Sequence, residues 1–320
     1  MAYRGKDAIR TVAEIGSGVI GSGWVATFLG NGLSVRLYDP APDAAEKTRA
    51  HVTRAWPQMV ELGLAKADDD WTARFSSHDQ IEDAVAGVDF VQESTPERTD
   101  VKAALFAELD RLVPSDVLVG SSTSSLPITD LQAGLGTAAR FVLGHPYNPV
   151  HLLPIVEVGG GEATDVDAIE TALIFYQGLG KETIRIKREL FGHIANRLTA
   201  AMFREAIRLV AEDYATVEDV DKAIRFGPAM KWAIQGQYTT SHTSGGAGGL
   251  AEFWPKFAPG IVKRWGGMSD PPLLDPALQA KLVQQMDEAA AGRSVAEIAA
   301  RQDDLLMEML KLFARKDRPA

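Results

Sequence analysis

The 320-residue chain contains no cysteine. Disulfide bonds, thiolate zinc sites and cysteine nucleophiles are therefore excluded, because each of them needs a sulfur that only cysteine supplies. Any catalysis has to use oxygen and nitrogen groups, and we expect no metal site.

Long apolar runs and an excess of basic residues are also lacking. No segment approaches the roughly 18 consecutive apolar residues of a membrane-spanning helix, and the N-terminal MAYRGKDAIRTVAEIG has no apolar signal-peptide core. The 33 Lys and Arg against 43 Asp and Glu give a net charge of −10. This balance disfavours nucleic acid as a partner and mildly favours a cationic or neutral substrate. We expect a soluble, cytoplasmic protein without a membrane partner.

Short apolar segments alternate with helical patterns as far as about residue 189, which is typical of βαβ units. Continuous apolar character predicts that residues 152–158 form a buried parallel strand. Beyond residue 189 only helical periodicity remains. The predicted fold class is α/β, with a Rossmann-type doubly wound, mainly parallel sheet in residues 1–189, followed by an all-helical domain in residues 190–320. The glycine-rich patch at 244–249 is interpreted as a loop or lid. The predicted strands are residues 11–15, 34–38, 88–94, 116–122, 140–146, 152–158 and 182–187.

A glycine-rich fingerprint follows the first strand. It reads Gly16-Ser17-Gly18-Val19-Ile20-Gly21 and opens a helix, so that Gly16 permits the turn, Gly18 lets a pyrophosphate approach and Gly21 allows close packing. Asp39 ends the second strand, 21 residues beyond Gly18. A carboxylate there accepts hydrogen bonds from both ribose hydroxyls and repels a 2′-phosphate, which predicts NAD as the cofactor.

Further polar residues follow the later strands. Glu97 and Lys102 lie at the start of the helix after the strand 88–94, and Ser122 ends the next strand. We predict that these three residues contact the cofactor, because ligands gather at the carboxyl ends of parallel strands. The alternative for Glu97 is that it complements the dipole of a helix N-terminus.

A second set of polar residues provides groups for the oxidation of an alcohol. His145 stands at a strand end in GHPYNP, and Glu157 lies 12 residues on in an apolar strand, where a lone carboxylate needs a partner. A histidine oriented by a buried glutamate is a good general base. Ser124 and Asn196 are predicted to hold the reacting oxygen. Taken alone, each of these residues is as well explained by a cap, a turn or a buried polar contact.

These residues together resemble the 3-hydroxyacyl-CoA dehydrogenase family over nearly the whole chain. The resemblance implies that His145 is the acid/base, that Glu157 orients it, and that Ser124 and Asn196 hold the reacting oxygen. The chain departs from the family pattern at Phe191 and His193, which flank a glycine. A related lysine-dependent type is disfavoured, because the interdomain helix presents Asn196 followed by arginine instead.

Within the family, GSGVIGSGW, QESTPER and GHPYNPVHLLPIVEV are most similar to the branch that oxidises L-carnitine to 3-dehydrocarnitine. His151 departs from that branch, which commonly has tyrosine there. A quaternary ammonium substrate favours aromatic contacts, so we predict that Tyr147, Trp232 and Tyr238 bind it together with Ser124 and Asn196. The alternatives are a 3-hydroxyacyl-CoA or L-gulonate substrate, or a non-catalytic crystallin-like NAD-binding protein. The second domain is expected to bind the substrate and to form a homodimer, as in relatives.

Overall fold

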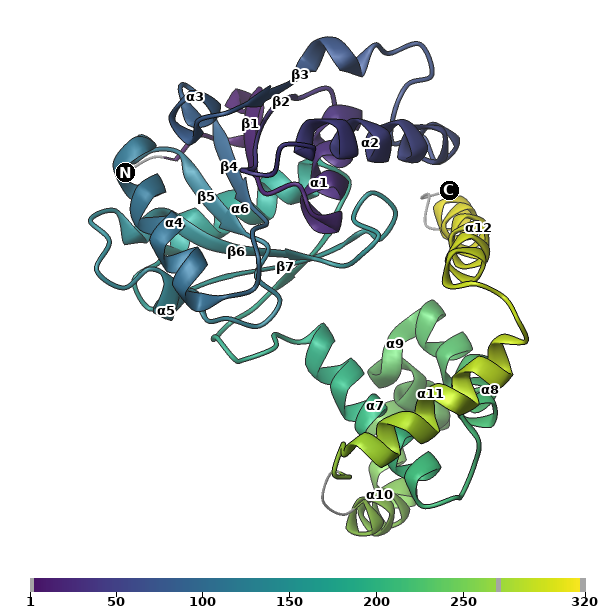
Figure 1. Cartoon of the computed structure of the whole chain (residues 1–320). Helices are drawn as coiled ribbons and strands as arrows, with labels where there is room; N and C mark the ends of the chain where they lie inside the picture. The colour runs from purple at the N-terminus through teal and green to yellow at the C-terminus, as the bar shows by residue number, and fades with distance from the viewer. Residues whose placement is uncertain (1–2, 269–271, 317–320) are drawn as a thin grey trace. The chain divides into compact units, whose positions relative to one another are not determined.

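The computed structural model describes residues 3–268 and 272–316. The chain divides into two compact units, Met1–Asn196 with Gln302–Ala320, and Arg197–Arg301. The predicted fold class is confirmed, because an α/β unit with a doubly wound sheet is followed by helices and turns (Figure 1). The assignment of cofactor binding to residues 1–189 and of substrate binding to residues 190–320 stays a prediction.

The sheet has eight strands in the order β3-β2-β1-β4-β5-β6-β7-β8. All neighbouring strands are parallel except β6 and β7, which run antiparallel. The carboxyl ends of β1 and β4 therefore meet where the strand order reverses, which is the place where doubly wound sheets bind their ligands. The strands span Thr11–Ile15 (β1), Ser34–Tyr38 (β2), Phe75–His78 (β3), Phe90–Glu93 (β4), Leu118–Ser121 (β5), Phe141–Pro146 (β6), Ile155–Gly160 (β7) and Glu182–Arg185 (β8).

The prediction of a parallel strand over residues 152–158 is wrong with respect to its neighbour β6, although β7 does run parallel to β8. Residues 147–154 alone separate β6 from β7, and a parallel pair would need a crossover of about a dozen residues or more. The reversal places His145 opposite Glu157 in the register. Strand β3 was not among the predicted strands, because its FSSH segment contains one apolar residue and no apolar run.

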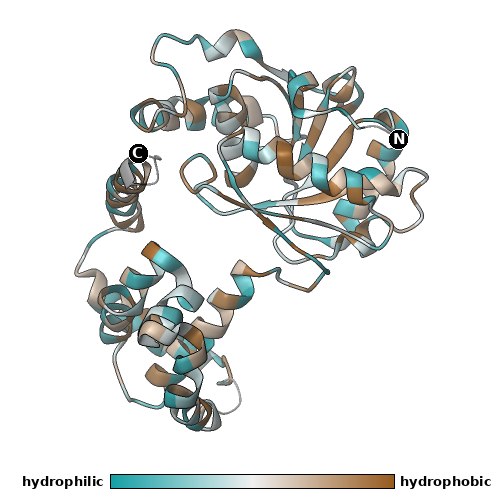
Figure 2. Cartoon of the chain, turned by 180° about the vertical axis from the view of Figure 1, so that it is seen from behind, coloured by the Kyte–Doolittle hydropathy of each residue, from teal (hydrophilic) through white to brown (hydrophobic). Residues whose placement is uncertain are grey.

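Helices cover both faces of the sheet. The first face carries α1 (Val19–Gly30), α2 (Ala44–Glu61) and α6 (Val166–Gly178). The second carries α3 (Ile81–Val85), α4 (Thr99–Leu112) and α5 (Ile128–Leu131). Large aromatic side chains are fully buried in both layers, and Figure 2 shows hydrophobic residues along the strands between them. Each buried aromatic stabilises the fold by about 1.5–3 kcal/mol, so these layers hold the strand ends in place.

The second unit consists of helices with little buried apolar surface of its own. Its buried apolar side chains in the described residues are Ile207, Val210, Val220 and Phe253. The glycine-rich patch forms a short 3-10 turn between α9 and α10. The helix α12 begins in this unit and ends in the first. The helices span Ala195–Ala211 (α7), Val217–Phe226 (α8), Pro228–Ser244 (α9), Gly249–Gly267 (α10), Pro276–Ala290 (α11) and Val295–Lys316 (α12).

Among residues 3–268 and 272–316, no helix is both long and apolar enough to cross a bilayer. Nor do three or more histidine, aspartate or glutamate side chains in that part of the chain come together as a set that could hold a metal ion.

Candidate functional site

The glycine fingerprint forms a tight turn between β1 and α1. Gly16 has a φ of +108°, and a Cβ there would lie 2.6 Å from the carbonyl oxygen of Ser94. A Cβ on Gly21 would collide with the carbonyl of Gly16, because helix and turn approach closely. Gly18 caps α1, and a Cβ on it would meet no described atom within 4 Å. The backbone at Gly18 is therefore open to a ligand at the helix N-terminus.

A cavity of about 690 Å³ lies in front of this turn and is lined by Gly16, Gly18, Asp39 and Ser94, among others. The Asp39 carboxylate accepts hydrogen bonds from the backbone N–H of Ser17 at 2.6 Å and from its hydroxyl at 2.8 Å. Asp39 Oδ1 accepts the N–H of Ala41 at 2.8 Å. A carboxylate has about four lone-pair positions, so Asp39 keeps one of them, on Oδ1, for a ribose hydroxyl. An open helix N-terminus, a cavity and a carboxylate at its wall fit a dinucleotide without a 2′-phosphate.

A buried ion pair lies at the carboxyl ends of β4 and β5. The Lys102 ammonium lies 2.7 Å from Glu93 Oε1, and these side chains are 1% and 0% exposed. Lys102 also lies 3.6 Å from Glu97 Oε2, and the Ser121 hydroxyl donates to Glu93 Oε2 at 2.5 Å. The structure therefore gives Lys102 internal partners, and its contact with the cofactor stays a prediction.

Glu97 organises the serine-rich loop that follows β5. Its Oε1 accepts hydrogen bonds from the Thr123 hydroxyl at 2.8 Å, from the N–H of Ser124 at 2.8 Å and from the N–H of Ser125 at 2.9 Å. Burial raises the pKa of Glu97, but hydrogen bonds from the hydroxyls of Thr123, Ser124 and Ser125, together with the charge of Lys102, outweigh burial and lower the pKa below its usual value. The charged carboxylate thus holds Ser124 in position.

Ser122 belongs to a buried polar network that the sequence analysis missed. Its hydroxyl accepts hydrogen bonds from Trp24 Nε1 at 3.0 Å and from Gln92 Nε2 at 2.8 Å, and it lies 2.9 Å from the Ser94 hydroxyl. The Tyr176 hydroxyl donates to Gln92 Oε1 at 2.6 Å. A glutamine directly after the two apolar residues that begin β4 was the available signal, because a buried amide needs partners. Since Ser94 lines the cofactor cavity, the network connects that cavity to the core.

His145 and Glu157 meet across β6 and β7. His145 Nδ1 lies 2.8 Å from Glu157 Oε2, and these side chains are 6% and 0% exposed. Glu157 Oε1 accepts the N–H groups of Ile194 at 2.9 Å and Ala195 at 3.0 Å at the start of α7. Burial raises the pKa of Glu157, but the bonds from His145 and from both N–H groups lower it below its usual value. The carboxylate favours a proton on His145 Nδ1 and leaves Nε2 as an acceptor.

Asn196 lies beside these groups in the same compact unit. Its Nδ2 donates to the carbonyl of Ser124 at 3.1 Å, and the Tyr147 hydroxyl donates to its Oδ1 at 2.8 Å. The His145 ring lies 5.9 Å from the ring of Tyr147 and 5.1 Å from that of His193, centroid to centroid. The structure thus brings Ser124, His145, Glu157 and Asn196 into one set, and their roles in the reaction stay predictions.

Two of the predicted substrate contacts belong to the second unit. Trp232 and Tyr238 lie on α9, on either side of a break at Gly236, where φ is +67°. Trp232 is 37% and Tyr238 is 78% exposed, and Trp232 Nε1 donates to Gln237 Oε1 at 2.5 Å. Their contact with a substrate stays a prediction.

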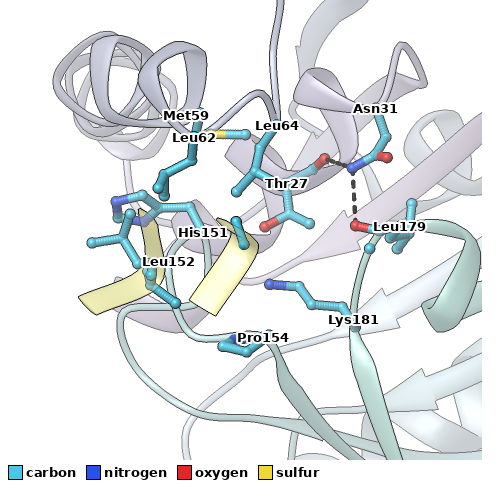
Figure 3. A pocket seen from close by; sticks show the side chains of 13 residues that line it. Thr27, Asn31, Met59, Leu62, Leu64, His151, Leu152, Pro154, Leu179 and Lys181 are labelled. Atoms are coloured by element: carbon cyan, nitrogen blue, oxygen red, sulfur yellow. Dashed lines mark hydrogen bonds between the residues drawn. The ribbon is translucent and has the colours of Figure 1, made fainter. Parts of the chain in front are cut away.

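His151 lies beside a smaller cavity of about 150 Å³, which shares no lining residue with the cofactor cavity (Figure 3). Its Nε2 donates to Gln58 Oε1 at 3.2 Å. Burial, followed by the neighbouring His51 and Lys181, lowers the pKa of His151 to about 4. The ring is therefore neutral at pH 7.

Comparison with known proteins identifies the relationship. The model of the 3-hydroxyacyl-CoA dehydrogenase NAD binding domain matches residues 11–189, and that of the C-terminal domain matches residues 192–286. The chain belongs to the 3-hydroxyacyl-CoA dehydrogenase family. It is accordingly an NAD-dependent oxidoreductase, which confirms the cofactor predicted from the glycine turn and Asp39.

Individual relatives extend over nearly the whole chain. An L-carnitine dehydrogenase from Nocardiopsis dassonvillei is 44% identical over 98% of this chain and 94% of its own length. One from Streptomyces coelicolor is 44% identical over 96% of each chain. Among solved structures, an NAD+-dependent 5-formyl-3-hydroxy-2-methylpyridine 4-carboxylic acid 5-dehydrogenase has a TM-score of 0.81 and 28% identity, and covers 97% of this chain and all of its own.

Two glycine variants separate the folding role of the turn from its binding role. Gly18→Ala adds a methyl group where no protein atom lies within 4 Å, so the midpoint of thermal unfolding should change little while NAD affinity falls at least about tenfold. Gly16→Ala forces a left-handed alanine, at about 1–2 kcal/mol, and should lower the midpoint. Fluorescence titration with NADH and calorimetry measure both quantities. Unchanged NAD affinity in Gly18→Ala would contradict the assignment of the cavity.

Proposed function

We propose that this family member oxidises the 3-hydroxyl of L-carnitine to the ketone of 3-dehydrocarnitine. The observation that carries the proposal is the buried His145–Glu157 pair, which leaves the second imidazole nitrogen available for a substrate hydroxyl. The choice of substrate is supported by L-carnitine dehydrogenases that are 44% identical over at least 96% of the chain.

His145 is the general base in this account. Its Nε2 takes the proton of the substrate hydroxyl, while the Glu157 carboxylate, 2.8 Å from Nδ1, stabilises the imidazolium that forms. Glu157 is fixed in turn by the Ile194 and Ala195 N–H groups, so the imidazole is oriented before substrate arrives. Bound NAD supplies the hydride acceptor of the reaction.

Asn196 and Ser124 stabilise the substrate oxygen as it becomes a carbonyl. The Ser124 hydroxyl donates to Glu97 Oε1 at 3.1 Å, so it turns from Glu97 to the substrate when the substrate binds. One hydrogen of Asn196 Nδ2 is donated to the carbonyl of Ser124, which leaves the second for the substrate. Tyr147 holds the same amide through Oδ1, which assigns its orientation. An amide held in advance in this way lowers the barrier, because Asn196 needs no rearrangement as charge develops.

The trimethylammonium group of the substrate needs contacts that attract a cation without hydrogen bonds. Aromatic faces attract such groups through cation–π interactions. We propose Tyr147, Trp232 and Tyr238 for this contact, and the net charge of −10 favours approach of a cation.

The direct test is NADH formation from NAD with L-carnitine, D-carnitine, 3-hydroxybutyryl-CoA and L-gulonate, each assayed separately. We expect turnover with L-carnitine, and His145→Gln should lower kcat by about 10²–10⁴-fold while NAD affinity stays within about twofold. Turnover confined to the coenzyme A ester or to gulonate would replace the proposed substrate and keep the base. Wild-type kcat in His145→Gln would remove His145 as the base.

We also propose that the second unit forms a homodimer. Large apolar side chains on several of its helices are more than half exposed, and such patches mark interaction surfaces. A second copy would cover an equivalent surface on each subunit and so form a closed, two-fold interface. These side chains are Leu198, Phe203, Phe226, Ile234, Val262 and Trp265.

Light scattering after size exclusion tests this proposal. The wild-type protein should have twice the mass of the chain, and Phe203→Glu should shift the protein toward monomer by placing a charge in the interface. Val166→Glu is the matched control, because Val166 is equally exposed on α6 of the first unit, at 63% against 62% for Phe203. A monomeric wild-type protein at micromolar concentration would contradict the proposal.

A further inference from the structure

The smaller cavity within the first unit has no part in the mechanism above. Its walls come from α1, α2, the connection between β6 and β7, the turn before β8, and the end of α12 (Figure 3). Its volume of about 150 Å³ corresponds to about five water molecules at about 30 Å³ each. A small organic molecule of six or seven heavy atoms is therefore of suitable size.

Lys181 places a buried positive charge at this cavity. The residue is 7% exposed, and its ammonium donates to the carbonyl of Leu153 at 3.1 Å and to that of Val150. These two bonds satisfy two hydrogens and leave the third without a hydrogen-bond acceptor among the described residues, and the ammonium lies 5.8 Å from the centroid of the Trp24 ring. Across the described ranges, no carboxylate lies within ion-pair distance of Lys181. A buried cation without a counter-charge is unfavourable, so an anion at this point would stabilise it.

The other lining residues are consistent with an anionic head and an apolar tail. None of the lining residues is acidic, and most are aliphatic, including Met59, Leu152 and Leu310. His151 is neutral at pH 7, since burial and the neighbouring His51 and Lys181 lower its pKa to about 4. Burial also lowers the pKa of Lys181 to about 8, which leaves its ammonium mostly charged at pH 7. Figure 3 shows the Lys181 side chain reaching in among these walls.

We propose that this cavity binds a short-chain aliphatic monocarboxylate. The carboxylate accepts the remaining N–H of Lys181, and the tail lies against Met59, Leu152 and Leu310. This site is separate from the oxidoreductase site, so it stands whichever 3-hydroxy acid the enzyme oxidises.

Methyl NMR of the full-length protein, saturated with NAD, tests the proposal without measuring activity. The chain has eight methionines, and the ¹³C-methyl signal of Met59 is assigned with Met59→Leu. Pentanoate should shift this signal in a saturable manner, whereas pentanamide, which has the same shape without the charge, should not. Equal shifts with both probes, no shift with pentanoate, or displacement of pentanoate by excess L-carnitine would overturn the proposal.

Substitution of the lysine tests the source of the selectivity. Lys181→Leu should weaken pentanoate binding about tenfold or more, as expected for the loss of a charge-assisted hydrogen bond. Lys187→Leu is the matched control, because Lys181 and Lys187 flank the same strand, β8, and Lys187 is exposed. Unchanged affinity for pentanoate in Lys181→Leu would overturn the proposal. If that variant does not fold, the comparison of pentanoate with pentanamide on the wild-type protein tests the same point.

Discussion

The arrangement of the site depends on the carboxylate of Glu157. One of its oxygens binds His145 on the neighbouring strand, and the other binds two backbone N–H groups at the start of α7. A carboxylate with no exposed surface is stable only when such bonds are made. The same bonds that allow Glu157 to be buried therefore orient the imidazole and anchor the helix that carries Asn196.

A second group of charged side chains supports the serine-rich loop of the site. Glu93 and Lys102 form a buried pair, and Glu97, beside Lys102, binds the loop that carries Ser124. Loss of one partner of a buried pair typically costs about 3–5 kcal/mol, since the other charge is left uncompensated. These charges are thus well placed to keep the serine-rich loop rigid. Asn196 then joins both sides, since it contacts the carbonyl of Ser124 and the hydroxyl of Tyr147.

Much of this architecture could be predicted from the sequence, because its signals are local. The glycine turn and Asp39 need only a short motif in a strand–turn–helix context, and the pairing of His145 with Glu157 follows from the cost of a lone carboxylate in an apolar strand. The direction of β7 was predicted wrongly, because apolar character reports burial and does not report direction. The length of the connection before it was the better signal.

Other features depend on contacts between distant parts of the chain. The network of Trp24, Gln92 and Ser122 joins α1, β4 and the end of β5. The sequence around each of these residues does not indicate that the other two are its partners. The same holds for Lys181, which the sequence analysis did not single out, and for His151, whose neighbour Gln58 lies 93 positions away. These contacts result from the packing of segments that are distant in the sequence, so the residue pattern within one segment does not predict them.

Glu157 orients His145 for proton transfer in this mechanism, and the Glu157→Gln variant isolates that role. Single-turnover formation of NADH with L-carnitine would be measured at saturating NAD, together with the NAD dissociation constant and the near-UV circular dichroism. We expect a rate at least about 100-fold below wild type, with NAD affinity within about twofold and an intact fold. A folded variant that forms NADH within about threefold of the wild-type rate would show that Glu157 does not have this role.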